Sequence, residues 1–232
     1  MTEHAGGSGG SYTRASHAGG SGGSSPRAST ATRLRSNATG LLDWRRQVAA
    51  LYARIRASDD PAAAHRLWTD ERNRLLRDHP ESPVPADDRA GFTGVPVAPY
   101  DPALRFTVAV DTDVEPARIE AQTGTDGEVP FERAGIMHVP GIGDLDVWWL
   151  ASYGGGIFVP VKDASPATYG GGRYLLDTVK GADLGGIDGH LVLDFNFAYN
   201  PSCAYDPAWA CPLAPPGNTV RVPINAGELY GK

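Results

Sequence analysis

Several features that would assign a chain to a broad class of protein are missing from these 232 residues. There is no run of about 18 consecutive apolar residues, so we expect no membrane-spanning helix. The N-terminus has no apolar segment of the kind that a signal peptide carries, and we therefore expect a cytoplasmic protein. The H-E-x-x-H motif, the Walker P-loop and the dinucleotide-binding glycine pattern are all absent, so none of these signatures assigns a reaction.

Positive charge is scarce over most of the chain. Residues 80–232 carry nine basic and twenty acidic side chains, a net charge of −11, whereas residues 1–79 carry a net charge of +5. A body this acidic repels a phosphate backbone, because nucleic-acid binding needs a cationic face. We therefore expect neither a nucleic-acid partner nor a membrane partner.

The first 40 residues contain few large apolar side chains but nine glycines and eight serines. Within them the sequence HAGGSGGS occurs twice, at residues 4–11 and 17–24. Such a segment cannot bury enough apolar surface to offset its conformational entropy. We predict that residues 1–40 form a disordered tail.

Residues 41–80 have the periodicity of two amphipathic helices. Apolar residues recur at spacings of three and four along the first: Leu41, Trp44, Val48, Leu51, Tyr52 and Ile55. Asp60 and Pro61 are suited to the N-cap and first position of the second helix. His79 precedes Pro80, and a residue before proline avoids the helical region, so the second helix should end there. The pattern predicts a helical hairpin.

Beyond residue 80 the period changes to two, and turns rich in glycine, aspartate and proline separate short apolar stretches. The predicted strands are 104–110, 117–123, 135–141, 145–152, 156–162, 173–179, 190–198 and 219–224, with a hairpin turn at 125–128. Strands without intervening helices favour an antiparallel barrel or sandwich. The prediction is thus an α+β protein in which two N-terminal helices precede an antiparallel β domain of about eight strands over residues 81–232.

The first candidate ligand site is KDASPATYGGGRY at residues 162–174. Consecutive glycines let the backbone approach a ligand and present its N–H groups, and a following arginine can hold a carboxylate or phosphate with two hydrogen bonds. Asp163 is the candidate general acid or base because it immediately precedes the loop. The predicted ligand-binding residues are Tyr169, Gly170, Gly171, Gly172 and Arg173. The alternative is a glycine-rich connection between strands in which Arg173 pairs with a neighbouring acid.

The second candidate is DFNFAYNPSCAYDPAWACPLAPPGN at residues 194–218. It has no regular period, yet its aromatic side chains and its Asn-Pro and Asp-Pro turns predict an ordered loop that lies over the sheet. We expect Asp194, Asn196, Tyr199 and Asn200 to face the same ligand as the TYGGGRY loop.

Cys203 and Cys211 are the only cysteines of the chain, and three interpretations of them stay open. They could be free thiols that pack as small apolar groups, a disulfide that closes a nine-residue loop, or a nucleophile or metal ligand. Should a reaction occur, Cys203 is the first nucleophile to test, and His138 is conceivable as its base. The sequence identifies no metal ligand set and no cofactor.

The chain resembles the domain of unknown function 1684 family of bacteria and archaea. The resemblance extends from Leu67 to the C-terminus and rests on LWTDERNRLLRDHPESPV, FVPVKDAS, TYGGGRYL, DFNFAYNPSCAYDPAWACPLAPPGN and the AGE at 226–228. The chain departs from the usual pattern at Val161, where the family has phenylalanine, and has one residue fewer between the prolines and Asn218. The resemblance implies no activity and no catalytic residue.

Two functions follow from these residues. The first is the binding of a small anionic molecule between the TYGGGRY and DFNFAYNPSCAY stretches, with catalysis by Asp163 and Cys203 left open. The second is a non-catalytic structural or protein-interaction domain in which the same residues form a buried polar network. The sequence does not indicate an oligomeric state.

Overall fold

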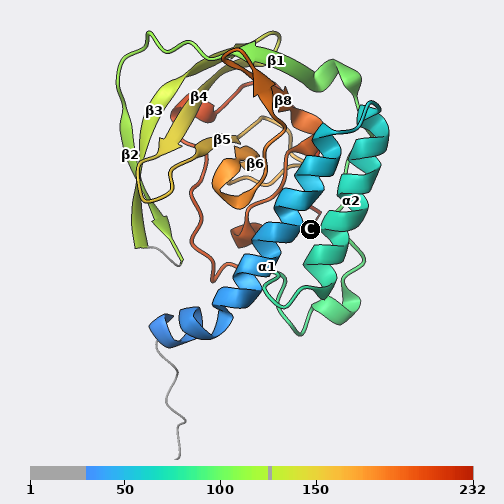
Figure 1. Cartoon of the computed structure of the whole chain (residues 1–232). Helices are drawn as coiled ribbons and strands as arrows, with labels where there is room; N and C mark the ends of the chain where they lie inside the picture. Colours follow the sequence, from blue (N-terminus) through green and yellow to red (C-terminus); the bar gives the residue numbers. More distant parts are fainter. Residues whose placement is uncertain (1–29, 125–126, 232) are drawn as a thin grey trace, which may run out of the picture.

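Two antiparallel helices lie against one side of an antiparallel β structure (Figure 1). The computed structural model describes residues 30–124 and 127–231, with side chains from residue 38 onward. Of the disordered tail predicted for residues 1–40, residues 1–29 fall outside this range, whereas residues 30–40 belong to the first helix. Because two helices precede two antiparallel sheets, the predicted α+β class is confirmed.

The helical hairpin consists of α1 (Thr30–Arg56) and α2 (Pro61–Asp78). The Asp60 side chain accepts hydrogen bonds from the backbone N–H groups of Ala62 and Ala63, as an N-cap should. His79, in an extended conformation, ends α2 as the following proline predicted. The first helix begins at Thr30, well before the start at residue 41 that the apolar periodicity predicted. Neither of these helices, the longest in the described residues, has the apolar stretch that a membrane span requires.

The β structure contains two sheets joined at both sides. One has the order β1 (Arg105–Ala109), β8 (His190–Asp194), β7 (Gly186–Ile187). The other has the order β2 (Arg118–Thr123), β3 (Gly127–Val139), β4 (Gly143–Leu150), β5 (Ile157–Val161), β6 (Arg173–Asp177). All neighbouring strands are antiparallel. Isolated bridges between Asp111 and Ile136, and between Tyr174 and Tyr199, connect the sheets. The two sheets thereby curve around a shared apolar core.

Some predicted strands have different limits. The stretch 219–224 is not a strand, because it makes only one bridge, between Thr219 and Lys162, and a hydrogen bond from Ala164 to Val222. The strand predicted for 190–198 ends at Asp194, whose side chain accepts from the N–H of Asn196 and starts a 3₁₀ turn. In contrast, β3 begins at Gly127, within the predicted turn 125–128, and is longer than the predicted strand 135–141.

The helices are attached to the β structure through a second apolar cluster. Trp68 of α2 packs on Phe197 with a ring separation of 5.4 Å, and Tyr52 and Ile55 of α1 belong to the same cluster as Ala182. Phe197 follows β8, at the start of the irregular segment 195–218. The packing therefore places this segment between the helical hairpin and the sheets, where a cavity forms.

Candidate functional site

The segment 195–218 is irregular but held in place along its length. Tyr199 exchanges two backbone hydrogen bonds with Tyr174 of β6. Further along, the Tyr174 hydroxyl donates to the carbonyl of Pro212 at 2.7 Å, and the N–H of Gly124 donates to the carbonyl of Ala210. The prediction of an ordered loop over the sheet agrees with these contacts.

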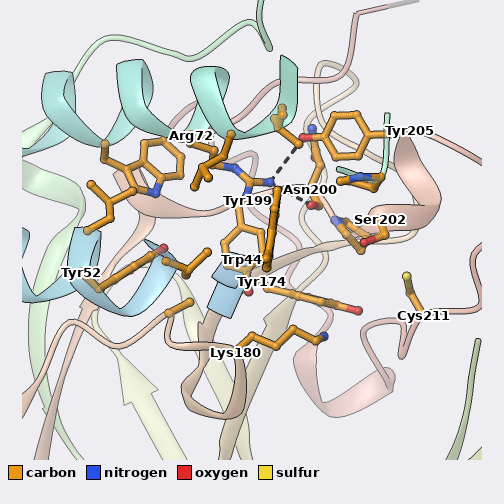
Figure 2. Close-up of a pocket in the computed structure, with 18 residues that line it drawn as sticks. Trp44, Tyr52, Arg72, Tyr174, Lys180, Tyr199, Asn200, Ser202, Tyr205 and Cys211 are labelled. Atoms are coloured by element: carbon orange, nitrogen blue, oxygen red, sulfur yellow. Dashed lines mark hydrogen bonds between the residues drawn. The ribbon is translucent and has the colours of Figure 1, made fainter. Parts of the chain in front are cut away.

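A cavity of about 80 Å³ lies between this segment and the helical hairpin (Figure 2). We call it the inner cavity. Six of its eighteen lining residues are aromatic, and Arg72 and Lys180 are its only charged lining residues among those the structure describes. Its aromatic members are Trp44, Tyr52, Trp68, Tyr174, Tyr199 and Tyr205. Such a wall suits a flat or compact organic group with a few polar atoms.

Arg72 of α2 is held at the cavity by a buried carboxylate. Its guanidinium donates to both carboxylate oxygens of Glu228, which is 1% exposed. The same group donates to the carbonyl of Asn200 and the hydroxyl of Tyr205, and it stacks over the Tyr199 ring at 4.6 Å (Figure 2). Burial would lower the pKa of Arg72, but the attraction of Glu228 outweighs it and raises that pKa above its usual range. Arg72 is therefore a permanent cation in a fixed orientation.

Asn200 presents an unused hydrogen-bond acceptor at the inner cavity. Its backbone N–H donates to Glu228 at 2.6 Å and its side-chain Nδ2 donates to the carbonyl of Leu229 at 3.2 Å. The second contact fixes the orientation of the carboxamide, because the opposite orientation would set two oxygens against each other. Asn200 is 3% exposed, yet its Oδ1 has no partner in the described structure. A buried acceptor without a partner costs about 1–3 kcal/mol.

The Tyr52 hydroxyl is a second polar group on the cavity wall without a hydrogen bond of good geometry. Burial raises the pKa of Tyr52 well above its usual range, with Arg72 and the nearby Trp68 indole acting in the opposite direction. Tyr205, hydrogen-bonded to Glu228 at 3.0 Å, also has a pKa raised by burial. Both phenols therefore stay neutral at physiological pH. Tyr205 donates its proton to Glu228, whereas the Tyr52 hydroxyl can donate to a ligand.

Arg173, the predicted anchor for an anion, lies elsewhere and is fully buried. Its two Nη groups donate to the Asp163 carboxylate at 3.0 Å and to the carbonyls of Ile224, Ala226 and Glu228. It lines none of the three cavities described here. The hypothesis that Arg173 anchors an anionic ligand is therefore corrected. The Asp163 carboxylate and three backbone carbonyls already accept hydrogen bonds from its Nη groups.

Asp163 is committed to the same network. Its carboxylate also accepts from the N–H groups of Ser165 and Ile224 and from the Thr168 hydroxyl. Its side chain is 1% exposed. A general acid or base has to reach a substrate, so this position does not suit the catalytic role predicted for Asp163.

The three glycines of the TYGGGRY stretch form a tight turn next to Tyr169. Gly172 donates its N–H to the Tyr169 carbonyl at 2.9 Å and has φ of +92°. A side chain there would come within 2.9 Å of the Val161 carbonyl oxygen and the Ala214 side chain. At Gly171 it would meet the Tyr169 ring at 2.6 Å, whereas at Gly170 it would meet nothing. Close packing of the chain thus accounts for Gly171 and Gly172.

Asp194 and Asn196 also satisfy one another. Asp194 accepts from both nitrogens of Asn196 and from Arg105 at 2.9 Å. Asn196 further exchanges two hydrogen bonds with the backbone of Asp101. Of the predicted ligand-binding residues, only Tyr199 and Asn200 lie on the inner cavity.

Both cysteines are free and half-buried. Cys203 receives a long hydrogen bond from the Tyr169 hydroxyl at 3.6 Å, and both thiols line a shallow apolar recess on the outer side of the loop. Burial raises the pKa of Cys211 to about 11, although a hydrogen bond with the backbone of Cys203 acts in the opposite direction. His138 pairs instead with Asp144 at 2.7 Å. In the described residues no group of three or more His, Cys, Asp or Glu could hold a metal ion.

The inner cavity contains residues that sequence reasoning did not select, chiefly Arg72 and Lys180. Neither residue was assigned a role from the sequence. Arg72, however, follows Trp68 by four residues and precedes Leu75 and Leu76 by three and four, so it lies on the apolar stripe of α2. A charged residue on a buried stripe is the signal that could have identified it.

Comparison with known proteins gives a family but no activity. A family model described as "Protein of unknown function (DUF1684)" matches residues 90–229. An uncharacterised protein of Haloarcula marismortui, solved by NMR in solution, is similar with 30% sequence identity and a TM-score of 0.50 over 69% of this chain and 89% of that one. None of the curated proteins matches the chain.

Proposed function

The chain belongs to the DUF1684 family of proteins of unknown function, and from that starting point we propose that it binds a small organic molecule in the inner cavity. The observation that carries this proposal is the Asn200 carboxamide oxygen, which is buried in the wall without a partner. A ligand that donates a hydrogen bond to Oδ1 would recover the desolvation cost of that oxygen.

The contrast with Asn218 supports a special role for Asn200. Asn218 is 0% exposed and every polar atom of its side chain is bonded: Oδ1 accepts from the Trp148 indole, and Nδ2 donates to the carbonyls of Asp146 and Pro160. The fold therefore can satisfy a buried asparagine completely. Asn200 lines a cavity and its side-chain oxygen is unpaired. This difference favours a ligand as the partner of that oxygen.

The charged wall residues indicate what the ligand should offer in return. Arg72 and Lys180 each have a carboxylate partner, Glu228 and Asp177, so a strong anion is not required to neutralise them. Their N–H groups nevertheless favour a ligand with hydrogen-bond acceptors. We therefore expect a compact group that both accepts and donates, such as a hydroxy acid or an amide.

Thermal denaturation with millimolar glycolamide, lactate and benzamide tests the proposal. We expect at least one compound to raise the Tm of the wild type, and Asn200→Leu to abolish that rise. Since Asn200→Leu removes both the unpaired oxygen and one hydrogen bond, its stability without ligand should stay within about 1 kcal/mol of the wild type. The matched control is Asn225→Leu, because Asn225 is exposed and does not line the cavity. This variant should respond to the compounds like the wild type.

A water molecule could also satisfy the Asn200 oxygen. In that case no compound would shift the Tm, or each would act equally on wild type and Asn200→Leu, and the binding proposal would fail. The proposal assigns no chemical step, because neither Asp163 nor Cys203 lines the inner cavity.

The second candidate is a non-catalytic structural domain, and it is favoured by the polar residues that saturate one another. Arg173 pairs with Asp163, and Asp194 pairs with Asn196 and Arg105. This arrangement holds the loops in place without any ligand. It becomes the better interpretation if the thermal experiment finds no Asn200-dependent shift.

A further inference from the structure

The inner cavity has a larger neighbour, which we call the outer cavity. It has a volume of about 560 Å³ and lies between the second sheet and residues 209–212 of the irregular segment. Side chains of β3, β4 and β5 supply an apolar wall, which includes Phe131, Leu150, Ile157 and Phe158.

The two cavities meet at a common boundary. Lys180, Ser202 and Cys211 line both of them. Lys180 is half-exposed, with 52% of its side chain accessible, and in Figure 2 it lies beyond Tyr174, across the aromatic group from Arg72. A change of the Lys180 rotamer, which would break its ion pair with Asp177, would widen this boundary.

The outer cavity also gathers apolar side chains that the fold leaves exposed. Trp209, Val179 and Tyr153 line it and are 38%, 37% and 107% exposed. Exposed apolar side chains that line one concave surface are typical of a binding site rather than of random surface variation. An apolar portion of a ligand would cover them.

Charged groups of both signs surround this apolar wall. Arg45 of α1 and Lys180 line the outer cavity together with Asp177 and Glu128. Lys180 pairs with Asp177 at 2.9 Å. Burial and the nearby Arg45 would lower the pKa of Lys180, but the attraction of Asp177 outweighs them and raises it, so Lys180 stays a cation. Because Arg45 and Lys180 line the same cavity, one anionic group placed between them would be attracted by both.

We propose that the inner and outer cavities form one two-chambered site for an amphipathic ligand. Its compact head accepts and donates hydrogen bonds in the inner cavity, and its apolar body lies in the outer cavity. Lys180 and Arg45 contact a negative charge at the junction. This inference rests on the proposed function, which concerns the inner cavity alone.

The test is a chain-length series of 2-hydroxy acids: lactate, 2-hydroxyhexanoate and 2-hydroxydecanoate, measured by calorimetric titration. The head is constant and only the apolar body grows, so affinity should rise roughly three- to four-fold per methylene while the outer cavity fills. Trp209→Gln should reduce the gain per methylene. Ile187→Gln is its matched control, because Ile187 is 69% exposed and lines neither cavity.

Two further variants locate the head and the charge. Asn200→Leu should weaken acids of every length by the same factor, about ten-fold. Lys180→Met should weaken the acids but not the corresponding 2-hydroxy amides, which lack the negative charge. Together these results would place the head inside, the charge at the junction and the chain outside.

Affinity that is independent of chain length, or a chain-length gain that Trp209→Gln leaves intact, would overturn the two-chambered site. If glycolamide or lactate still binds in an Asn200-dependent manner, the inner-cavity function survives that failure. Absence of binding by all acids and amides overturns both.

Discussion

Arg173 and Asp163 form an ion pair at 3.0 Å in which the two side chains are 0% and 1% exposed. The pair joins the start of β6 to the turn after β5, and its remaining hydrogen bonds reach the C-terminal carbonyls of Ile224, Ala226 and Glu228. Glu228 in turn binds Arg72 at the inner cavity. The buried pair therefore supports the cavity indirectly, by fixing the segment that carries Glu228.

Loss of one partner of this pair should be costly. We expect Arg173→Met to lower the free energy of unfolding by about 3–5 kcal/mol, because it leaves the Asp163 carboxylate buried without its counter-charge. Urea denaturation measures the change. The matched control is Arg118→Met, which removes an exposed ion pair with Glu120 and should cost less than about 1 kcal/mol. A cost for Arg173→Met as small as that of the control would contradict the structural role.

The TYGGGRY glycines offer a comparison within one turn. Gly172 has φ of +92° and contacts that exclude a side chain, whereas Gly170 has open space around it. Gly172→Ala should therefore destabilise the protein by more than about 1 kcal/mol, and Gly170→Ala should leave stability unchanged or raise it by about 0.4–1 kcal/mol. Thermal unfolding of both variants checks this. Equal effects would argue against close packing as the reason for Gly172.

His65 should make the protein less stable in mild acid. It is buried against Trp68, Tyr100 and Phe197, with ring separations of 5.5–5.7 Å. Burial lowers its pKa, opposed by a hydrogen bond to the backbone of Asn196 and by the charge of Asp194, with Arg66 acting in the same direction as burial. The folded state thus resists protonation that the unfolded state accepts below about pH 6.5.

His65 has no effect on stability above about pH 7, and stability falls as the pH drops through 6.5, by up to about 1.4 kcal/mol per pH unit. Urea denaturation at pH 7.5 and 5.5 should show a smaller loss for His65→Phe than for the wild type. His138→Gln is an opposite-sign control, because the hydrogen bond with Asp144 raises the pKa of His138. Identical pH dependence in His65→Phe and wild type would refute the assignment.

Cys211 should be an unreactive thiol in the folded protein. Its pKa of about 11, raised mainly by burial, leaves little thiolate at pH 8. In the variant Cys203→Ser, where Cys211 is the sole cysteine, we expect labelling by a thiol reagent to be about 100-fold slower in buffer than in concentrated urea. Equal rates in the two conditions would show that Cys211 is neither buried nor electrostatically suppressed.

The local parts of the fold were predictable from the sequence. The N-cap Asp60 and the stop at His79 act within one helical turn, so residues near in sequence determine α2. Alternating apolar residues likewise predicted most strands, because one face of each is buried. The stretch 219–224 alternates as well, yet its pairing with the segment after β5 stops at one bridge. Pro223 has no backbone N–H and cannot donate to a ladder.

The candidate site was less accessible to such reasoning. Arg173 offers the same planar donor group to an external phosphate or to an internal carboxylate, and the partners that the structure supplies lie at Asp163 and residues 224–228. The sequence left both partners open for Arg173, and the internal carboxylate is the one that the structure pairs with it. Tyr199 and Asn200 were placed in a ligand site on the TYGGGRY side, whereas the cavity they line faces the helices.

The irregular segment 195–218 was predictable from the sequence in its local order but not in its tertiary contacts. Its prolines, aromatic rings and asparagines by themselves determined that it would be an ordered loop, because they favour turns and supply anchors within a few residues. Only tertiary structure decided that α2 would bring Arg72 against it, and that Asn200 would keep an oxygen free at a cavity. Local stereochemistry acts between neighbours in the chain, whereas the pairing of buried charges depends on which distant segments the apolar core brings into contact.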